Sequence, residues 1–303
     1  MAVDVVGKHK LWLGISGAFV AAGLVAMLWS TITLGSPLRL GIDFTGGTFW
    51  QLRFKTATPT LTQVREVLTK KDLGNSIIQL SGKEVLIRAK PLSQEERLAV
   101  QAALKQELGD YTLDRIETVG PTLGRELLVN GLLAMFVTLT AIAVYVSIRF
   151  QSDFAVFALV AMLHDVIVLS GFFAFLGLVA NVEIDSLFVV ALLTVVGFSV
   201  TDTVVVYDRI RENMKFVSRK KPFAEVVNES VNQTFARSLN TSFTALLSLL
   251  ALYFFGGVTL KDFSLALIIG FAAGAYSSIF NASILLVIWR EYQASQKTKS
   301  KPA

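Results

Sequence analysis

Residues 187–207 read LFVVALLTVVGFSVTDTVVVY, an apolar run of membrane-spanning length that contains one carboxylate, Asp202. No Lys, Arg or His lies within the run. A carboxylate in contact with lipid hydrocarbon is energetically costly, so such residues usually face the interior of a helix bundle and mark ion or proton pathways. Asp202 therefore indicates a membrane protein with a transport role that depends on an ion gradient.

The composition of the whole chain agrees with a polytopic membrane protein. Hydrophobic residues make up 53% of it and charged residues 17%, with a mean hydropathy of +0.59. The absence of cysteine excludes disulfides and thiolate ligands, and two histidines are too few to suggest a histidine metal site. The net charge of +5 is attributed to membrane orientation and not to nucleic-acid binding.

Sequence motifs for catalysis are missing from the chain. It contains neither the phosphate-loop pattern GxxxxGK[ST] nor the zinc-protease pattern HExxH, and no nucleophile lies in a recognisable setting. We expect no cofactor, no metal and no enzymatic activity, so the energy for transport would come from an ion gradient or from a partner.

Six apolar runs are long enough to cross a bilayer core of about 30 Å. A polar insert, residues 35–125, separates the first two runs and is expected to fold as a separate α+β domain. The first run follows two lysines, as in a signal peptide, but it is too long for a signal core and is interpreted as a retained anchor. The six runs are residues 11–33, 127–148, 154–179, 187–207, 238–255 and 263–288.

The boundaries of the runs divide the chain into four parts. Residues 1–34 form a tail and the first span, and residues 35–125 form the insert. Residues 126–290 form a five-helix bundle that includes the basic loop 208–237, and residues 291–303 form a basic tail.

Lys and Arg gather in segments that belong to one side of the membrane. The two short loops of the opposite side, residues 181–185 and 256–262, contain Lys261 as their one basic residue. We therefore expect both termini in the cytoplasm and the insert outside. Within the basic loop, residues 215–222 are interpreted as an inside anchor, with binding to anionic lipid or a cytosolic partner as the alternative. The cytoplasmic basic residues are Lys8, Lys10, Arg149, Arg209, Arg211, Lys215, Arg219, Lys220, Lys221, Arg237, Arg290, Lys297, Lys299 and Lys301.

The insert has the pattern of a small ferredoxin-like domain. Thr60 with Gln63, and Ser93 with Glu96, predict capping boxes at the starts of two helices. The resulting order is βαββαβ. We expect such a domain to contact another molecule and not to perform covalent chemistry. The predicted elements are strands at 47–54, 76–80, 84–89 and 111–119, and helices at 60–73 and 93–108.

Polar residues also recur inside the other apolar runs. In the fifth run, a stripe spaced as one helical face should meet protein or water, because lipid cannot satisfy it. Arg237 begins this stripe near the cytoplasmic end, at a depth where it could pair with Asp202. A structural ion pair is the alternative to an ion relay. The stripe consists of Arg237, Asn240, Thr241, Thr244 and Ser248.

The third and sixth runs contribute further polar residues. His164 and Asp165 lie within the third run and form either part of a relay or a satisfied buried pair. In the sixth run, Gly270, Gly274 and Ser278 form a small-xxx-small face, interpreted as packing within the chain or against a partner, with Ser277 and Asn281 beside it. Ser and Thr near Asp202, namely Ser199, Thr201 and Thr203, are explained equally well by helix packing.

Five motifs in this order resemble the SecF family. They are GIDFTGGT (41–48), VGPTLGREL (119–127), HDV (164–166), GFSVTDTVVVYDRIRE (197–212) and RSLNTS (237–242). SecF proteins are membrane subunits of the SecD–SecF accessory complex of the bacterial protein translocase, within the resistance–nodulation–division superfamily. The resemblance extends from about residue 38 to residue 290.

The resemblance implies a function, a set of partners and a relay. It implies that a proton gradient, or sodium in some relatives, drives late steps of protein export together with SecD, the SecYEG channel and the motor SecA. The exterior domain would touch the translocating polypeptide, and membrane lipids would surround the bundle. By the same resemblance, Asp202 and Arg237 form the proton relay. An accessory polar network would comprise His164, Asp165, Ser199, Thr201, Thr203, Asn240 and Thr241.

The implied location is the bacterial inner membrane, although a thylakoid membrane would give the same topology. One departure from the family pattern is Thr201, where members often have asparagine, which alters the hydrogen bonding expected around Asp202. Two other functions compete. One is half of a gradient-driven exporter of small molecules or lipids, against which the small insert argues. The other is a scaffold that uses no gradient.

Overall fold

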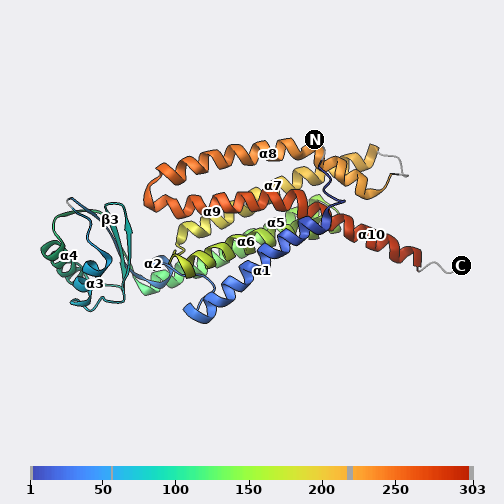
Figure 1. Cartoon of the computed structure of the whole chain (residues 1–303). Helices are drawn as coiled ribbons and strands as arrows, with labels where there is room; N and C mark the ends of the chain where they lie inside the picture. Colours follow the sequence, from blue (N-terminus) through green and yellow to red (C-terminus); the bar gives the residue numbers. More distant parts are fainter. Residues whose placement is uncertain (1–2, 56, 217–220, 300–303) are drawn as a thin grey trace. The chain divides into compact units, whose positions relative to one another are not determined.

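The computed structural model describes residues 3–55, 57–216 and 221–299 (Figure 1). Within these residues, six helices are long and apolar enough to cross a membrane, which confirms the predicted spans. The sixth is continuous through three consecutive elements, α9, η1 and α10. The helices are α1 (His9–Leu34), α5 (Pro121–Arg149), α6 (Ser152–Val179), α7 (Ser186–Phe216), α8 (Phe223–Phe255), α9 (Gly257–Tyr276), the π-helix η1 (Ser277–Ala282) and α10 (Ser283–Lys299).

The chain forms two compact units. One runs over Leu40–Leu133, and the other joins Met1–Arg39 to Ala134–Ala303. The second unit contains the bundle, in which α6 lies against α1, α7 and α9, and α8 packs against α7 and α9 (Figure 1).

The smaller unit has the predicted ferredoxin-like fold. Its sheet has the order β2-β3-β1-β4 with every neighbouring pair antiparallel. Alternate residues of β1, namely Trp50, Leu52 and Phe54, are buried under the helices, as the two-residue period of a strand requires. The elements are α2 (Ile42–Thr45), β1 (Gly47–Phe54), α3 (Leu61–Thr69), β2 (Ile77–Ser81), β3 (Glu84–Ala89), α4 (Gln94–Leu108) and β4 (Tyr111–Val119).

Both predicted capping boxes are present in this unit. The hydroxyl of Thr60 accepts a hydrogen bond from the backbone N–H of Gln63, whose side chain accepts one from the N–H of Thr60. Ser93 and Glu96 repeat the arrangement at α4. The hydrogen bond from the Ser93 backbone, followed by that from its hydroxyl, holds the pKa of Glu96 below its usual value.

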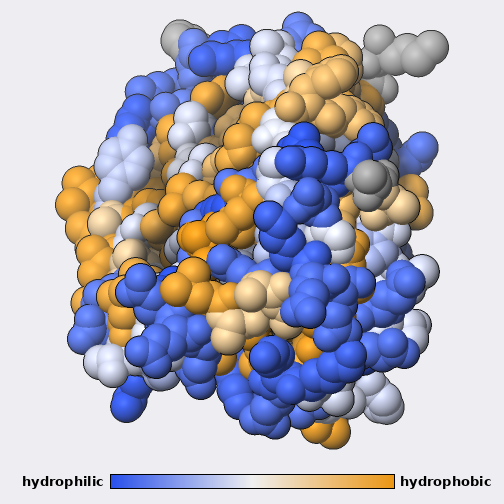
Figure 2. Space-filling view, turned by 90° about the vertical axis from the view of Figure 1, so that its left-hand side faces the viewer, coloured by the Kyte–Doolittle hydropathy of each residue, from blue (hydrophilic) through white to orange (hydrophobic). Residues whose placement is uncertain are grey.

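The surface of this unit suits an aqueous setting. Figure 2 shows hydrophilic residues over much of the visible face, with apolar residues between them. Single leucines such as Leu61, Leu98 and Leu113 are among the exposed apolar side chains. Scattered exposure of this kind is normal for a water-facing domain.

A double-glycine turn connects α2 to β1 within the same unit. Gly46 has a φ of 76°, and a Cβ there would lie 2.9 Å from the Cα of Pro121, at the start of α5. Gly124 sits equally close to the backbone of Gly46. Only glycine gives both the left-handed conformation and the close approach.

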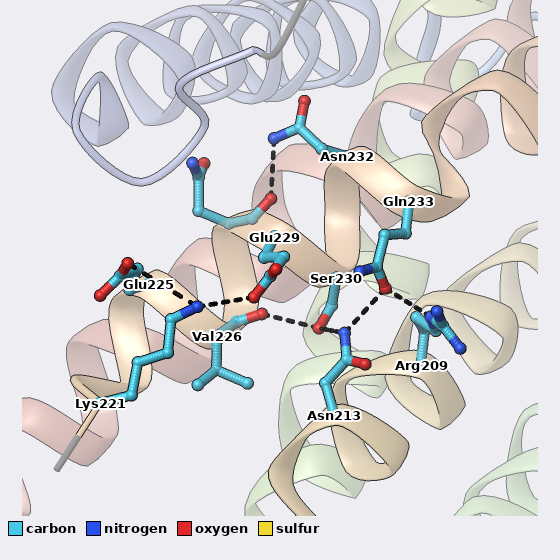
Figure 3. Close-up of polar contacts among 10 residues, drawn as sticks. Arg209, Asn213, Lys221, Glu225, Val226, Glu229, Ser230, Asn232 and Gln233 are labelled. Atoms are coloured by element: carbon cyan, nitrogen blue, oxygen red, sulfur yellow. Dashed lines mark hydrogen bonds and ion pairs between the residues drawn. The ribbon is translucent and has the colours of Figure 1, made fainter. Parts of the chain in front are cut away.

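The C-terminal end of α7 and the N-terminal end of α8 extend beyond the apolar runs and are joined by polar contacts (Figure 3). Asn213 donates to Ser230 and Gln233, at 2.8 and 2.9 Å, and Arg209 donates to Gln233 at 2.5 Å. Farther along, Lys221 pairs with Glu229 at 2.8 Å. Hydrogen bonds therefore hold these ends of the two helices together.

The structure bears on the predicted basic anchor only in part. Of residues 215–222, those at 217–220 lie outside the described residues, and so do Arg219 and Lys220 with them. Lys301 of the basic tail is likewise outside the described part of the chain.

The N-terminal segment is held by two asparagines of α8. Asn232 accepts from the N–H of Val3 at 2.7 Å and donates to its carbonyl at 2.8 Å. Asn228 accepts from the N–H of Val5 at 2.9 Å, and Val5 is fully buried in the core of the bundle. These contacts fix the entry into α1.

Small residues allow the helices of the bundle to approach closely. A Cβ at Gly171 of α6 would lie 2.2 Å from the Cα of Gly23 on α1. Gly270 of α9 faces Val195 of α7, and Gly274 faces Ser199 one turn later. The small-residue face of the sixth span thus packs on α7 within the chain.

The Gly23–Gly171 contact predicts a position-specific loss of stability. Gly23→Ile forces a branched side chain against the α6 backbone, and overpacking of this kind costs about 1–3 kcal/mol. Gly14→Ile on the same helix is the matched control, because a Cβ at Gly14 meets nothing within 4 Å. Thermal unfolding of the purified full chain should show a lower midpoint for Gly23→Ile alone. Equal midpoints for the two variants would contradict the close packing.

Candidate functional site

Asp202 lies on α7 where three elements meet, and its side chain is half-buried. One carboxylate oxygen accepts a hydrogen bond from Ser238 Oγ of α8 at 2.7 Å. The other accepts one from Ser278 Oγ of η1. Both oxygens of this membrane carboxylate are therefore satisfied by hydroxyls from other helices.

Arg237 does not contact Asp202 in this structure. The expected ion pair is absent, since neither residue has an ion-pair partner within the described ranges 3–55, 57–216 and 221–299. The reason is helical geometry. Arg237 precedes Ser238, and consecutive residues of an α-helix differ by about 100° around the axis. Ser238 is buried and faces Asp202, so Arg237 is turned to the exposed surface of α8.

The polar stripe that Arg237 begins is exposed along its length. Asn240, Thr241, Thr244 and Ser248 are all exposed, which confirms that they share one face. The hydroxyls of Thr241 and Thr244 donate to carbonyls of their own helix, at 2.9 and 2.8 Å. The stripe therefore points away from this chain's bundle and adds nothing to the contacts of Asp202 within it.

A second carboxylate, Asp165 of α6, is completely buried. Its Oδ2 accepts from Ser199 Oγ of α7 at 2.5 Å and from Ser277 Oγ of η1 at 2.7 Å. Its Oδ1 lies 2.9 Å from Nδ1 of His164. Of the predicted accessory network, the structure thus brings together His164, Asp165 and Ser199.

The two remaining threonines of the predicted network do not join this cluster. Thr201 is exposed and donates to the carbonyl of Gly197 at 2.8 Å, one turn back on its own helix. Thr203 is buried beside Asp202 in sequence, but successive positions place it on a different face of α7. Its burial agrees with a packing role.

The Nε2 side of the His164 imidazole lies away from Asp165. It lines an apolar cavity of about 550 Å³ between α1, α6 and α9, together with Gly23, Gly171 and Tyr276. Its Nε2 is buried and has no hydrogen-bond partner in the described part of the chain. The ring is thus bonded on its Asp165 side alone.

The π-helix η1 is the element that sequence reasoning missed. Its first two residues, Ser277 and Ser278, each donate to a different carboxylate, Asp165 and Asp202. Farther on, Asn281 donates to Ser16 of α1 at 2.8 Å. Short π-helical turns often occur at functional sites. Two adjacent serines deep in an apolar run were the available signal, but they fitted packing equally well.

The contacts of Ser238 predict which neighbour of Asp202 matters for stability. Ser238→Ala removes a donor from a half-buried carboxylate, a loss that costs about 1–3 kcal/mol. Ser248→Ala is the matched control on the same helix, because its hydroxyl is exposed and bonds to its own backbone. It should change stability by no more than about 0.5 kcal/mol, and Arg237→Gln likewise.

Thermal unfolding of the purified chain measures all three variants. A larger loss for Arg237→Gln than for Ser238→Ala would mean that arginine, and not serine, holds Asp202.

Fold and site together define a multi-pass membrane protein with an inserted ferredoxin-like domain and two carboxylates bonded to hydroxyls inside its bundle. Comparison with known proteins shows the family to which the chain belongs. The model for the C-terminal part of the protein export membrane proteins SecD/SecF matches residues 99–292, and the SecD/SecF GG motif matches residues 31–58, around Gly46 and Gly47. The chain belongs to the SecD/SecF family.

Relatives that match over most of their length support this assignment. The chain is 45% identical to protein translocase subunit SecF of Synechocystis over 297 residues, covering 95% of this chain and 94% of the relative. It is 42% identical to the SecF subunit of Thermobaculum terrenum, covering 90% and 91%.

A solved structure shows the same architecture. The crystal structure of SecDF from Thermus thermophilus, described as translocon-associated, superposes with a TM-score of 0.85 at 37% identity. The match covers 96% of this chain and 39% of that one, so this chain spans well under half of the solved protein.

Proposed function

We propose that this protein is the SecF-type subunit of an accessory translocase complex that couples an ion gradient, most simply of protons, to late steps of protein export. The observation that carries the proposal is Asp202, an ionisable group in a membrane span whose two oxygens bond to hydroxyls from two other helical elements. Hydroxyl groups donate hydrogen bonds to the carboxylate but carry no positive charge that would hold it permanently ionised. In our proposal the carboxyl therefore gains and loses a proton. The translocase names of the relatives supply the process.

The exposed stripe of α8 supports a membrane partner for this chain. A row of Arg237, Asn240 and Thr241 in contact with lipid would be costly, so another protein or water must cover it. In the Thermus thermophilus relative named SecDF, the segment that matches this chain makes up 37% of a longer chain. We propose a SecD-type subunit as the partner. The proposed assembly also includes SecYEG and SecA. The exterior domain would contact the translocating polypeptide.

We propose that Arg237 is the alternative partner of the Asp202 carboxylate in the relay. Because it neighbours Ser238, a rotation of α8 by about 100° would exchange the hydroxyl for the guanidinium beside Asp202. The serine-bonded arrangement suits a carboxyl that is exchanging a proton, and the arginine-bonded one suits a carboxylate that has released it. His164, Asp165 and Ser199 form the accessory network of this relay.

The proposed setting is the bacterial inner membrane, with both termini in the cytoplasm and the ferredoxin-like domain outside. The basic loop and tails carry this orientation through their charges. A thylakoid membrane satisfies the same charge distribution. In either membrane the protein acts by mechanical coupling and catalyses no covalent reaction.

The decisive substitution is Asp202→Asn, which keeps the size and polarity of the side chain but cannot titrate. Secretion of an unfolded precursor should fall to the level seen without a gradient, at matched expression and matched assembly. Asp208→Asn is the control. It lies on the same helix and makes surface ion pairs with Arg149 and Arg211, which are weak contacts. It should secrete normally. Unchanged gradient-dependent secretion in Asp202→Asn would refute the proposal.

A further inference from the structure

We propose that Asp165 is a second proton-binding carboxyl whose protonation is coupled to that of Asp202 through the adjacent serines Ser277 and Ser278. The proposal deepens the proposed function and rests on its assignment of Asp202 as the relay group. It assigns a positioning role to η1, which would transmit the charge state of one carboxyl to the other.

The surroundings of Asp165 lack the partner that a permanent carboxylate requires. A buried charge without a cation is strongly unfavourable, so a structural carboxylate is normally paired with Lys or Arg. In the described part of the chain the one ion-pair partner of Asp165 is His164, which is charged only when protonated. The His164–Asp165 pair can therefore hold or release a proton, and His164 Nε2 has no bond to lose when it does so.

The groups that face Asp165 are few. Its own helix supplies His164, and the helices packed on α6 supply mostly hydroxyls and apolar side chains. Residues 11–34 of α1 and the whole of η1 contain no titratable side chain, and Arg290 of α10 is paired with Asp153. The titratable residues within the apolar stretches of α7 and α9 are Asp202, Tyr207 and Tyr276.

The serines have two alternative acceptors each. Ser277 Oγ donates to Asp165 and also lies 3.2 Å from the carbonyl of Gly274. Ser278 Oγ donates to Asp202 and lies 3.2 Å from the carbonyl of Ala275. When a carboxyl is protonated, its O–H group becomes a hydrogen-bond donor. The serine hydroxyl can then accept that hydrogen bond and donate its own hydrogen to the backbone carbonyl. Each serine is thus a two-position switch.

The switches are linked because they are neighbours at the start of one π-turn. A π-helix has a different hydrogen-bond spacing from the α-helices on either side, and such turns occur mostly as local distortions. Reorienting Ser277 at Asp165 therefore changes the geometry from which Ser278 reaches Asp202. Carboxyls that interact in this way titrate as a pair and not independently.

The test is a pH titration of Asp202 in the full chain, purified in lipid nanodiscs with the subunits that accompany it. Infrared difference spectra report the protonated carboxyl band, and subtraction of Asp202→Asn identifies the contribution of Asp202. In Asp165→Asn and in Ser277→Ala, the midpoint should move by about one pH unit, a tenfold change in proton affinity. Ser264→Ala should leave it in place, because this buried serine bonds only to the carbonyl of Leu260 among the described residues.

A second step tests the route of the coupling. In a Ser278→Ala background, Asp165→Asn should no longer move the Asp202 midpoint, as a double-mutant cycle requires if the serine carries the interaction. If Asp165→Asn fails to fold, Ser277→Ala alone decides, because Asp165 keeps its contacts with Ser199 and His164 there.

An Asp202 midpoint that stays fixed in Asp165→Asn and Ser277→Ala would overturn the inference and leave Asp165 as a buried structural pair. Persistence of the Asp165→Asn shift without Ser278 would overturn the proposed route. Failure of the proposed function is distinguishable from both, because it appears as unchanged secretion in Asp202→Asn whatever the titrations show.

Discussion

The cost of placing carboxylates among apolar helices governs the structure of this bundle. Asp165 and Asp202 lie in spans whose other residues are almost entirely apolar, and neither has an Arg or Lys partner among the described residues. Each is stabilised by serine hydroxyls from two other elements. Because these hydroxyls must stay within hydrogen-bond distance, the carboxylates fix the positions of α6, α7, α8 and η1 relative to one another.

Small residues make that arrangement sterically possible. Gly274 lies over Ser199, so α9 approaches α7 closely enough for the following serines to reach the carboxylates. Gly23 and Gly171 do the same for α1 and α6. The sixth span then departs from α-helical spacing at Ser277, and this is where it donates to both carboxylates. The hydrogen bonds to the two carboxylates therefore depend on the close packing of the helices.

The sequence predicted the features that depend on local pattern. Apolar run lengths indicated six spans, and strand alternation with two capping boxes indicated the ferredoxin-like domain. The relation between Asp202 and Arg237 could not be predicted, because equal depth says nothing about direction around the helix axis. Ser238 and Arg237 are neighbours in sequence, yet one faces the bundle and the other faces outward. The π-turn was also hidden, since it depends on a shifted backbone register and not on residue type.

Proton uptake by sealed vesicles would show whether Asp202 lies on an ion path, because it follows the ion without requiring protein export. The chain and the subunits that co-purify with it would be reconstituted with an internal pH dye, and a pH gradient would be imposed across the membrane. We expect a proton flux that Asp202→Asn abolishes and Asp208→Asn retains. A flux of equal size in Asp202→Asn would mean that the carboxyl held by Ser238 and Ser278 lies outside the ion path.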